Sequence, residues 1–181
     1  VPLDLTESDT IDQLGAALHE RFGRIDIVIG NAGTLGELTP VNHLEPTTWD
    51  NIIALNVTAN YRLIRSMDPL LKASDAGRAI FVTSRATVDL NPFWGGYAAS
   101  KAALEVLVKT YAQEIQHTNI RVNLVDPGRQ QTAMRAKAFP GENPRNLRQP
   151  DEMTGVFVDL AESNFAQNGR TFEAYPEIFP K

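Results

Sequence analysis

The sequence contains no cysteine, so disulfides, thiolate metal sites and a cysteine nucleophile are excluded. Histidine is scarce as well, and His19, His43 and His117 are too scattered for metal-ligand spacing, so no metal site is expected. No apolar run approaches the roughly 18 residues of a membrane span, and no signal peptide precedes the first helical pattern. These absences favour a cytoplasmic protein without a membrane partner.

Positive charge is also limited. Lys and Arg number 17 against 22 Asp and Glu, so the formal net charge is −5 and no broad basic surface is available to neutralise phosphates. Nucleic acid is therefore not an expected partner. The remaining composition, 43% hydrophobic and 22% charged, is ordinary for a globular protein, and 181 residues predict a single domain spanning 1–181.

Strand and helix patterns alternate along the chain. Alternation of this kind predicts right-handed crossovers and a parallel sheet covered on both faces, which is an α/β doubly wound, Rossmann-like fold. The one long irregular stretch, 128–150, is expected to form a substrate lid loop. The predicted strands are 25–30, 78–84, 120–128 and 171–175, and the predicted helices are 8–22, 47–71, 97–116 and 151–162.

Three polar side chains are expected to meet at one edge of this sheet. Ser84 ends a predicted strand, and Tyr97 and Lys101 lie one helical turn apart at the start of the next helix. Ligands bind at the carboxyl ends of parallel strands, so the three residues can share a pocket. An ammonium lowers the pKa of a neighbouring tyrosine from about 10, and a serine hydroxyl polarises a carbonyl. The group therefore suits proton transfer coupled to hydride transfer.

Five short motifs carry a resemblance to a known family. They are NAG at 31–33, LNV at 55–57, VTS at 82–84, YAASK at 97–101 and PGRQQT at 127–132. In their order and spacing the sequence resembles the short-chain dehydrogenase/reductase family over essentially its whole length. The resemblance implies an NAD(P)-dependent oxidoreductase that interconverts a carbonyl and a secondary alcohol on a small-molecule substrate, with NAD or NADP as cofactor. It also implies a homodimer or homotetramer.

The resemblance also assigns roles to individual residues. Tyr97 corresponds to the catalytic acid/base, and Ser84 to the serine that polarises the substrate. Lys101 corresponds to the lysine that lowers the tyrosine pKa and holds the nicotinamide ribose. Asn56 corresponds to the asparagine that holds a water of the proton relay. The implied cofactor-binding residues are Asp4, Asn31, Ala32, Gly33, Tyr97, Lys101, Pro127, Gly128 and Thr132.

Structural explanations of these residues stay open. In isolation, Tyr97 and Lys101 are better explained as a half-buried aromatic and a solvated lysine, and only their register with other motifs favours catalysis. Asn56 could cap or bend its helix, and Asp4 could be a turn residue. Thr132 could be a helix N-cap, a role that is compatible with a cofactor contact.

Some positions depart from the family or suggest a substrate. Gly30 replaces a frequent second asparagine, and Gln130 replaces a frequent apolar residue. The lid is basic, which could attract an anion, although a solvated loop is the simpler interpretation. The basic lid residues are Arg129, Arg135, Lys137, Arg145 and Arg148, against Glu142. An apolar mouth built from Phe93, Trp94, Met134 and Phe139 would suit a small apolar carbonyl or alcohol.

The front of the chain differs most from the family. The family begins with a strand, a Gly-rich turn for the pyrophosphate and a second strand, whereas PLDLT at 2–6 resembles the end of its third strand. By this comparison roughly 50–60 residues of a typical domain are missing. The fold is therefore expected to be N-terminally incomplete, with 25–30 as an exposed apolar sheet edge.

Two hypotheses about function follow from this front. The chain is either the carboxyl portion of an oxidoreductase or a truncated, non-catalytic α/β module that cannot bind a dinucleotide. Because the pyrophosphate needs the Gly-rich turn and a helix amino-terminus, we expect the 181-residue chain by itself to be catalytically silent.

Overall fold

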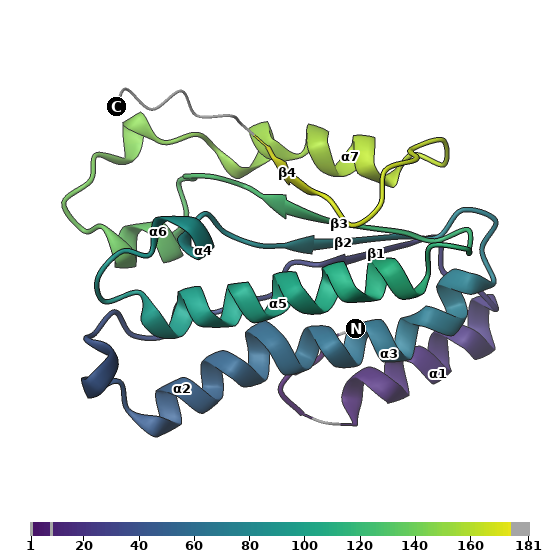
Figure 1. The fold of residues 1–181 in the computed structure, drawn as a ribbon, viewed down its shortest axis with the longest axis horizontal. Coiled ribbons are helices and arrows are strands. Elements are labelled where there is room, and N and C mark those ends of the chain that lie inside the picture. The colour runs from purple at the N-terminus through teal and green to yellow at the C-terminus, as the bar shows by residue number, and fades with distance from the viewer. Residues whose placement is uncertain (1, 8, 175–181) are drawn as a thin grey trace.

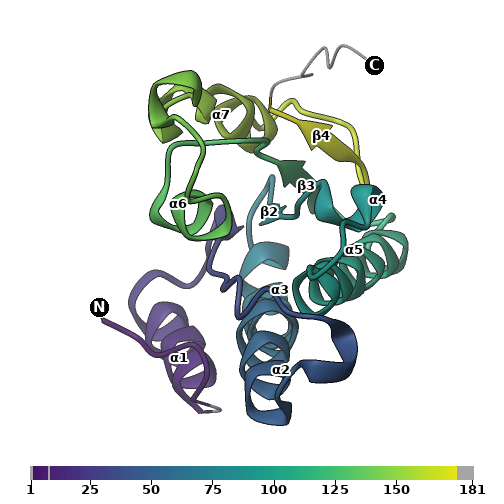
Figure 2. The same ribbon diagram turned by 90° about the vertical axis from the view of Figure 1, so that its left-hand side faces the viewer.

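The computed structural model describes residues 2–7 and 9–174 as a parallel sheet with helices packed on both faces (Figure 1; Figure 2). The strands are β1 (Ile27–Gly30), β2 (Arg78–Val82), β3 (Arg121–Asp126) and β4 (Thr171–Glu173). The α-helices are α1 (Thr10–Phe22), α2 (Pro46–Ile53), α3 (Ala59–Lys72), α4 (Ala86–Asp89), α5 (Gly95–Glu114), α6 (Ala133–Ala138) and α7 (Gly155–Ala161). Each strand and helix predicted from the sequence has a counterpart among these elements.

The four strands run parallel in the order β1-β2-β3-β4. In their register Ile29 lies beside Ile80, and Ile80 lies beside Asn123. The carboxyl ends of all four strands therefore lie at the same edge of the sheet. The predicted Rossmann-like α/β architecture is confirmed.

Helices cover the two faces of the sheet unequally. Phe81 packs into the main core with Leu70 of α3 and Leu104 of α5, whereas the adjacent Ile80 packs on the opposite face against Leu160 of α7. The strands follow one another in the order β1-β2-β3-β4, so connections of the same hand would all pass over the same face of the sheet. Helix α7, which connects β3 to β4, lies on the face opposite to α3 and α5, so this crossover has the opposite hand. The prediction that every crossover is right-handed is therefore wrong. The reason is that β2 and β3 are apolar on both faces, and α7 covers the second one.

The helix predicted over 47–71 is interrupted near its middle. A π-helical segment, Ala54–Thr58, joins α2 to α3. The wider π turn places Asn56 inside the protein, where it is fully buried. Single π turns inside α-helices occur often at functional sites.

The lid is more ordered than the sequence predicted. Residues 128–150 contain α6 and a 3-10 turn at Pro144–Asn146, so the prediction of an irregular loop is wrong for these parts. Thr132 caps α6, since its Oγ1 accepts the backbone N–H of Arg135 at 3.1 Å. A helix of this length is too short to show a hydrophobic period, which is why the pattern missed it.

Strand β1 lies at the edge of the sheet. Ile27 and Ile29 are 46% and 47% exposed there, in agreement with the apolar edge predicted for 25–30. The structure also explains why Gly30 stands where an asparagine was expected. A Cβ at Gly30 would overlap the Phe81 ring and would lie 2.6 Å from Oδ1 of Asn60, so no side chain fits.

Within residues 2–7 and 9–174, no helix combines the length and the apolar character needed to cross a bilayer. In the same ranges, no three His, Asp or Glu side chains are grouped as metal ligands.

Candidate active site

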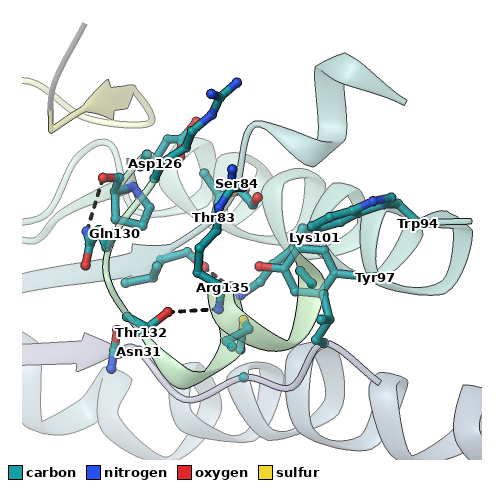
Figure 3. Close-up of a pocket in the computed structure, with 18 of the residues that line it drawn as sticks. Asn31, Thr83, Ser84, Trp94, Tyr97, Lys101, Asp126, Gln130, Thr132 and Arg135 are labelled. Atoms are coloured by element: carbon teal, nitrogen blue, oxygen red, sulfur yellow. Dashed lines mark hydrogen bonds between the residues drawn. The ribbon is translucent and has the colours of Figure 1, made fainter. Parts of the chain in front are cut away.

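A cavity of about 430 Å³ lies at the carboxyl edge of the sheet. The loops that follow β1, β2 and β3 form its floor, and the start of α5 and the lid helix α6 form its walls (Figure 3). Nine of the predicted site residues line this cavity: Asn31, Ala32, Gly33, Ser84, Tyr97, Lys101, Pro127, Gly128 and Thr132. Asn56 and Asp4 do not.

Tyr97, Lys101 and Ser84 converge in the cavity as predicted. Both α5 side chains are nearly buried, with Tyr97 8% and Lys101 3% exposed. Lys101 Nζ lies 5.9 Å from the centroid of the Tyr97 ring and donates to Val82 O at 2.9 Å. Ser84 accepts the N–H of Ala86 at 3.2 Å, which holds its hydroxyl at the end of β2.

Burial dominates the electrostatics of this group. It lowers the pKa of Lys101 to about 8. It also raises the pKa of Tyr97, a rise that the Ser84 hydroxyl opposes and that the Asp126 carboxylate reinforces. The sequence predicted the opposite direction for Tyr97, because the lysine ammonium was expected to stabilise the phenolate. Desolvation outweighs that effect, so Tyr97 keeps its proton at neutral pH.

Asn56 lies outside the cavity and forms hydrogen bonds to the loop after β1 and to α5. Its Nδ2 donates to Thr34 O and to Ser100 Oγ, both at 2.9 Å, and its Oδ1 accepts the N–H of Thr34 at 2.8 Å. The side chain therefore fastens the loop after β1 to the helices. Its backbone carbonyl accepts Nδ2 of Asn60 at 2.9 Å. The bending role is visible in the π-helical segment, while the proton-relay role stays a prediction.

Asp4 lies outside the main cavity. Its carboxylate accepts the backbone N–H and the hydroxyl of Thr6, at 2.9 and 2.7 Å, and these bonds lower its pKa. This is the turn geometry that the sequence left open. Asp4 lines a separate depression that shares Ala32 with the main cavity.

The loop after β3 lines the cavity with backbone and short side chains. Gly128 adopts a left-handed conformation, with φ of 70°, and its N–H donates to Asp126 Oδ1 at 3.0 Å. Gln130, which replaces an apolar residue, turns its side chain back to donate to Pro127 O at 3.1 Å. Thr132 both lines the cavity and caps α6, so its two predicted roles are compatible in the structure.

The apolar mouth differs in part from the prediction. Trp94 and Met134 line the cavity as predicted. Phe139 does not line it and instead packs against Trp94, with ring centroids 5.7 Å apart. Phe93 does not line the cavity and is 56% exposed, because its backbone turns with φ of 76° just before α5. The sequence missed Leu35 and Ala138, which complete the apolar wall.

Two basic lid side chains are engaged within the protein. Arg135 forms an ion pair with Glu142, with Nη2 2.7 Å from Oε1, and stacks on Phe139. Lys137 Nζ donates to Gly36 O at 2.8 Å, which ties α6 to the loop after β1. These contacts fix the position of the lid and reduce its capacity to attract an anion.

Sequence reasoning also missed Asp126. It ends β3, is 9% exposed and lines the same cavity as Ser84 and Tyr97. Its position at the carboxyl end of a parallel strand was the signal that could have identified it.

Comparison with known proteins places the chain in a known family. A model of the short chain dehydrogenase family matches residues 1–143. The chain belongs to this family, as its motifs suggested.

Individual relatives agree with this assignment. The chain is 36% identical over 170 residues to the uncharacterized oxidoreductase YciK of Escherichia coli (strain K12), covering 93% of this chain and 67% of YciK. It is 33% identical over 177 residues to an uncharacterized NAD-dependent oxidoreductase of Mycobacterium tuberculosis (strain CDC 1551 / Oshkosh), covering 88% of this chain and 64% of that protein. The chain thus spans about two thirds of these relatives, and whether a Gly-rich segment is missing stays a prediction.

Solved structures extend the likeness to three dimensions. A short chain dehydrogenase of Salmonella enterica serovar Typhi matches with a TM-score of 0.92 at 35% identity, over 96% of this chain and 73% of that one. One from Shigella flexneri 2a, complexed with NADP, matches with a TM-score of 0.91 at 37% identity, over 96% and 74%. At the level of the family, the predicted cofactor class of NAD or NADP is confirmed.

The cavity fits the nicotinamide part of such a cofactor. Gly33 passes so close to the site that a Cβ there would lie 3.3 Å from both Asn56 Oδ1 and Lys101 Nζ. A side chain at Gly33 would press against Asn56 and Lys101, so glycine lets the loop after β1 lie close to both residues at the edge of the cavity. On the far side, Pro127 and Gly128 present another stretch of backbone without a large side chain.

Proposed function

We propose that this chain belongs to an NAD- or NADP-dependent enzyme that interconverts a carbonyl and a secondary alcohol on a small, mainly apolar substrate. One observation carries the proposal. The buried phenol of Tyr97 lines the same cavity as Ser84 and Lys101, at the edge of the sheet where ligands of such folds bind.

Each residue of the trio has a task that its surroundings support. Burial raises the pKa of Tyr97, so its Oη carries a proton at neutral pH and can donate it to a carbonyl oxygen. The Ser84 hydroxyl beside it orients that oxygen and withdraws electron density from the carbonyl carbon. Lys101, held by Val82 O, keeps a positive charge next to the ring and stabilises the phenolate left after proton donation.

The cofactor would lie between two loops. Asn31, Ala32 and Gly33 form one side, and Pro127, Gly128 and Thr132 form the other. When bound, NAD or NADP supplies or accepts the hydride, which none of the side chains in the cavity can do. Asp4 would lie toward the adenine side, because its depression adjoins the cavity through Ala32.

The substrate class follows from the wall that faces Tyr97. Leu35, Trp94, Met134 and Ala138 present apolar surface, and the lid contacts of Arg135 and Lys137 hold that wall in place. Short aliphatic or aromatic ketones and aldehydes fit such a surface.

A panel of carbonyl substrates with NADH and NADPH tests the proposal. In the enzyme to which this chain belongs, as distinct from the 181-residue chain by itself, we expect reduction of small apolar carbonyls. We expect loss of that activity in Tyr97→Phe but not in Tyr61→Phe, whose side chain lies on the exposed outer side of α3. Absence of turnover across the panel, or equal activity in the two variants, would overturn it.

The non-catalytic module remains the second candidate, and the exposed edge of β1 favours it. Calorimetry with NAD and NADP separates the two. A dissociation constant in the micromolar range for the 181-residue chain would support the enzyme and contradict the expected silence of this chain. No binding at millimolar cofactor would support the module.

Assembly and location complete the proposal. We propose a cytoplasmic homodimer or homotetramer, because Trp49 of α2, Tyr61 of α3 and Val106 of α5 expose apolar surface on the outer side of the helical layer. Other apolar side chains of these helices, Ile52, Leu104 and Val108, are buried within this chain and do not contribute to that surface. Sedimentation should show an oligomer at micromolar concentration, and a pure monomer would contradict it.

A further inference from the structure

Asp126 is a buried acid in the cavity to which the proposed function gives no task. It ends β3, is 9% exposed, and lines the cavity with Ser84 and Tyr97 (Figure 3). A buried carboxylate destabilises the folded protein unless ion pairs and hydrogen bonds compensate for the loss of water.

The turn after β3 does not require the charge. Asp126 Oδ1 accepts the N–H of Gly128 at 3.0 Å, which shapes the Asp-Pro-Gly turn. The Oδ1 of an asparagine would accept the same bond without a charge. The turn therefore explains an oxygen at this position but not a carboxylate.

The surroundings of Asp126 are mixed in charge. Glu173 faces it from β4 and Glu105 from α5, and both of these carboxylates, together with burial, raise the pKa of Asp126. The guanidinium of Arg85 and the Gly128 N–H act in the opposite direction. Arg85 is shared, because it also lies 3.7 Å from Glu173.

The charge of Asp126 reaches the reactive centre. Its carboxylate raises the pKa of Tyr97 from across the cavity. The cations that line the same cavity are Lys101, bonded to Val82 O, Arg135, paired with Glu142, and Arg129.

We propose that Asp126 is a specificity-determining residue whose carboxylate disfavours substrates carrying an anionic group beside the reacting carbonyl, and favours neutral substrates there. The inference rests on the proposed function and concerns the same cavity. A carboxylate of the substrate that is held near Asp126, away from bulk water, meets a like charge, whereas an ester or a hydroxyl does not.

A matched pair of substrates tests this selectivity. 3-Oxobutanoate and its methyl ester share the reacting ketone and differ by one charge. The wild-type protein should reduce the ester with the higher kcat/KM. Asp126→Asn should raise the ratio of kcat/KM for the acid to kcat/KM for the ester about tenfold or more, because the asparagine keeps the bond to Gly128 and removes only the charge, and any change in the acidity of Tyr97 acts on both substrates alike.

Two controls separate charge from structure. Asp159→Asn changes the net charge equally on the exposed side of α7 and should leave the ratio of acid to ester unchanged. Asp126→Ser supplies a second neutral residue with a hydroxyl acceptor, in case the asparagine variant folds poorly, and should shift the ratio in the same direction.

A spectroscopic titration gives a readout that does not depend on turnover. The absorbance change of the Tyr97 phenol, taken as the difference between each protein and its Tyr97→Phe counterpart, should move to lower pH in Asp126→Asn. An unchanged Tyr97 titration would show that the charge does not reach the site and would overturn the inference.

The outcomes distinguish the two proposals. If wild-type protein reduces no carbonyl of the panel, the proposed function fails, and the inference about Asp126 fails with it. If wild-type protein reduces both members of the pair and Asp126→Asn leaves their ratio unchanged, the inference alone fails.

Discussion

A buried cation lies at each end of the sheet, and the two differ in the number of hydrogen bonds that they donate to the protein. At the amino end, Arg78 begins β2 and is 3% exposed. Its guanidinium donates to the backbone oxygens of Gly77, Asn119, Glu162, Ser163 and Phe165. At the carboxyl end, Lys101 donates to Val82 O, and within the described parts of the chain the structure shows no second hydrogen bond from its ammonium.

The difference separates a structural charge from a reactive one. A guanidinium has five N–H donors and stays charged. By donating to five carbonyl oxygens, Arg78 holds β2 to the segment after α7. An ammonium has three donors, and Lys101 next to an open cavity uses one of them. Burial disfavours the charged ammonium and lowers its pKa to about 8. Donors left without protein partners can bind a ligand.

The largest effect is expected from Tyr97→Phe, which changes the chemistry at the carboxyl end alone. Loss of the proton-donating Oη should lower kcat by about a thousandfold, while the free energy of unfolding changes by no more than about 1 kcal/mol. Steady-state kinetics and urea unfolding on the same preparations check both parts. More than a few per cent of wild-type activity would remove Tyr97 from its role.

Arg78→Met should destabilise the protein at the amino end of the sheet without changing the active-site cavity. Removing the guanidinium leaves buried carbonyl groups without their donor, which should lower the free energy of unfolding by about 3 kcal/mol. Urea unfolding measures this change, and the pKa of Tyr97 should stay at its wild-type value. Arg121→Met is the matched control on β3: its guanidinium bonds only the nearby Thr118 O and Ile120 O among the described residues, so the loss should be about 1 kcal/mol.

Lys101→Met should stabilise the protein while impairing the site. The pKa of Lys101 is about 8 when folded and about 10.4 when unfolded, so the unfolded chain binds more protons between these values. In the wild type the free energy of unfolding therefore rises with pH from about 8 to 10.4, and the full penalty applies below pH 8. We expect Lys101→Met to gain roughly 2 kcal/mol at pH 7, after loss of the bond to Val82 O.

The pH dependence is the sharper part of that test. Unfolding free energies measured from pH 7 to 10.5 should rise in the wild type and show a flatter profile in Lys101→Met. Activity should fall, and its pH optimum should move upward, because the phenolate of Tyr97 loses its cation. Parallel stability profiles in the two proteins would contradict the low pKa of Lys101.

Tyr111→Phe should have the smallest effect and should touch neither cation. Tyr111 Oη donates to Asp68 Oδ1 at 2.8 Å and so joins α5 to α3, far along the helix from Tyr97. Its loss should lower the free energy of unfolding by about 1 kcal/mol, since Asp68 keeps Lys72 as a partner. Thermal unfolding measures it. A change in kcat would show that the two ends of α5 are coupled.

Local sequence patterns were sufficient to predict the part of the site that lies on one helix and at one strand end. Tyr97 and Lys101 share a face because four residues make about one helical turn, and Ser84 joins them because parallel strands end at one edge. Asp4 shows the limit of such reasoning. The sequence left a turn residue and a cofactor contact open. The structure shows that the Asp4 carboxylate accepts hydrogen bonds from Thr6 in a turn, and the cofactor contact stays a prediction.

The sequence by itself determined the alternation of strands and helices, the family, and the Ser84, Tyr97 and Lys101 trio, because periodicity and strand-end motifs are properties of short stretches of chain. Only the tertiary structure decided the rest. It placed α7 on the second face of the sheet, joined Asn56 to Thr34 and buried Asp126 in the cavity. It also reversed the direction of the Tyr97 pKa shift, since desolvation depends on which distant segments close over a side chain.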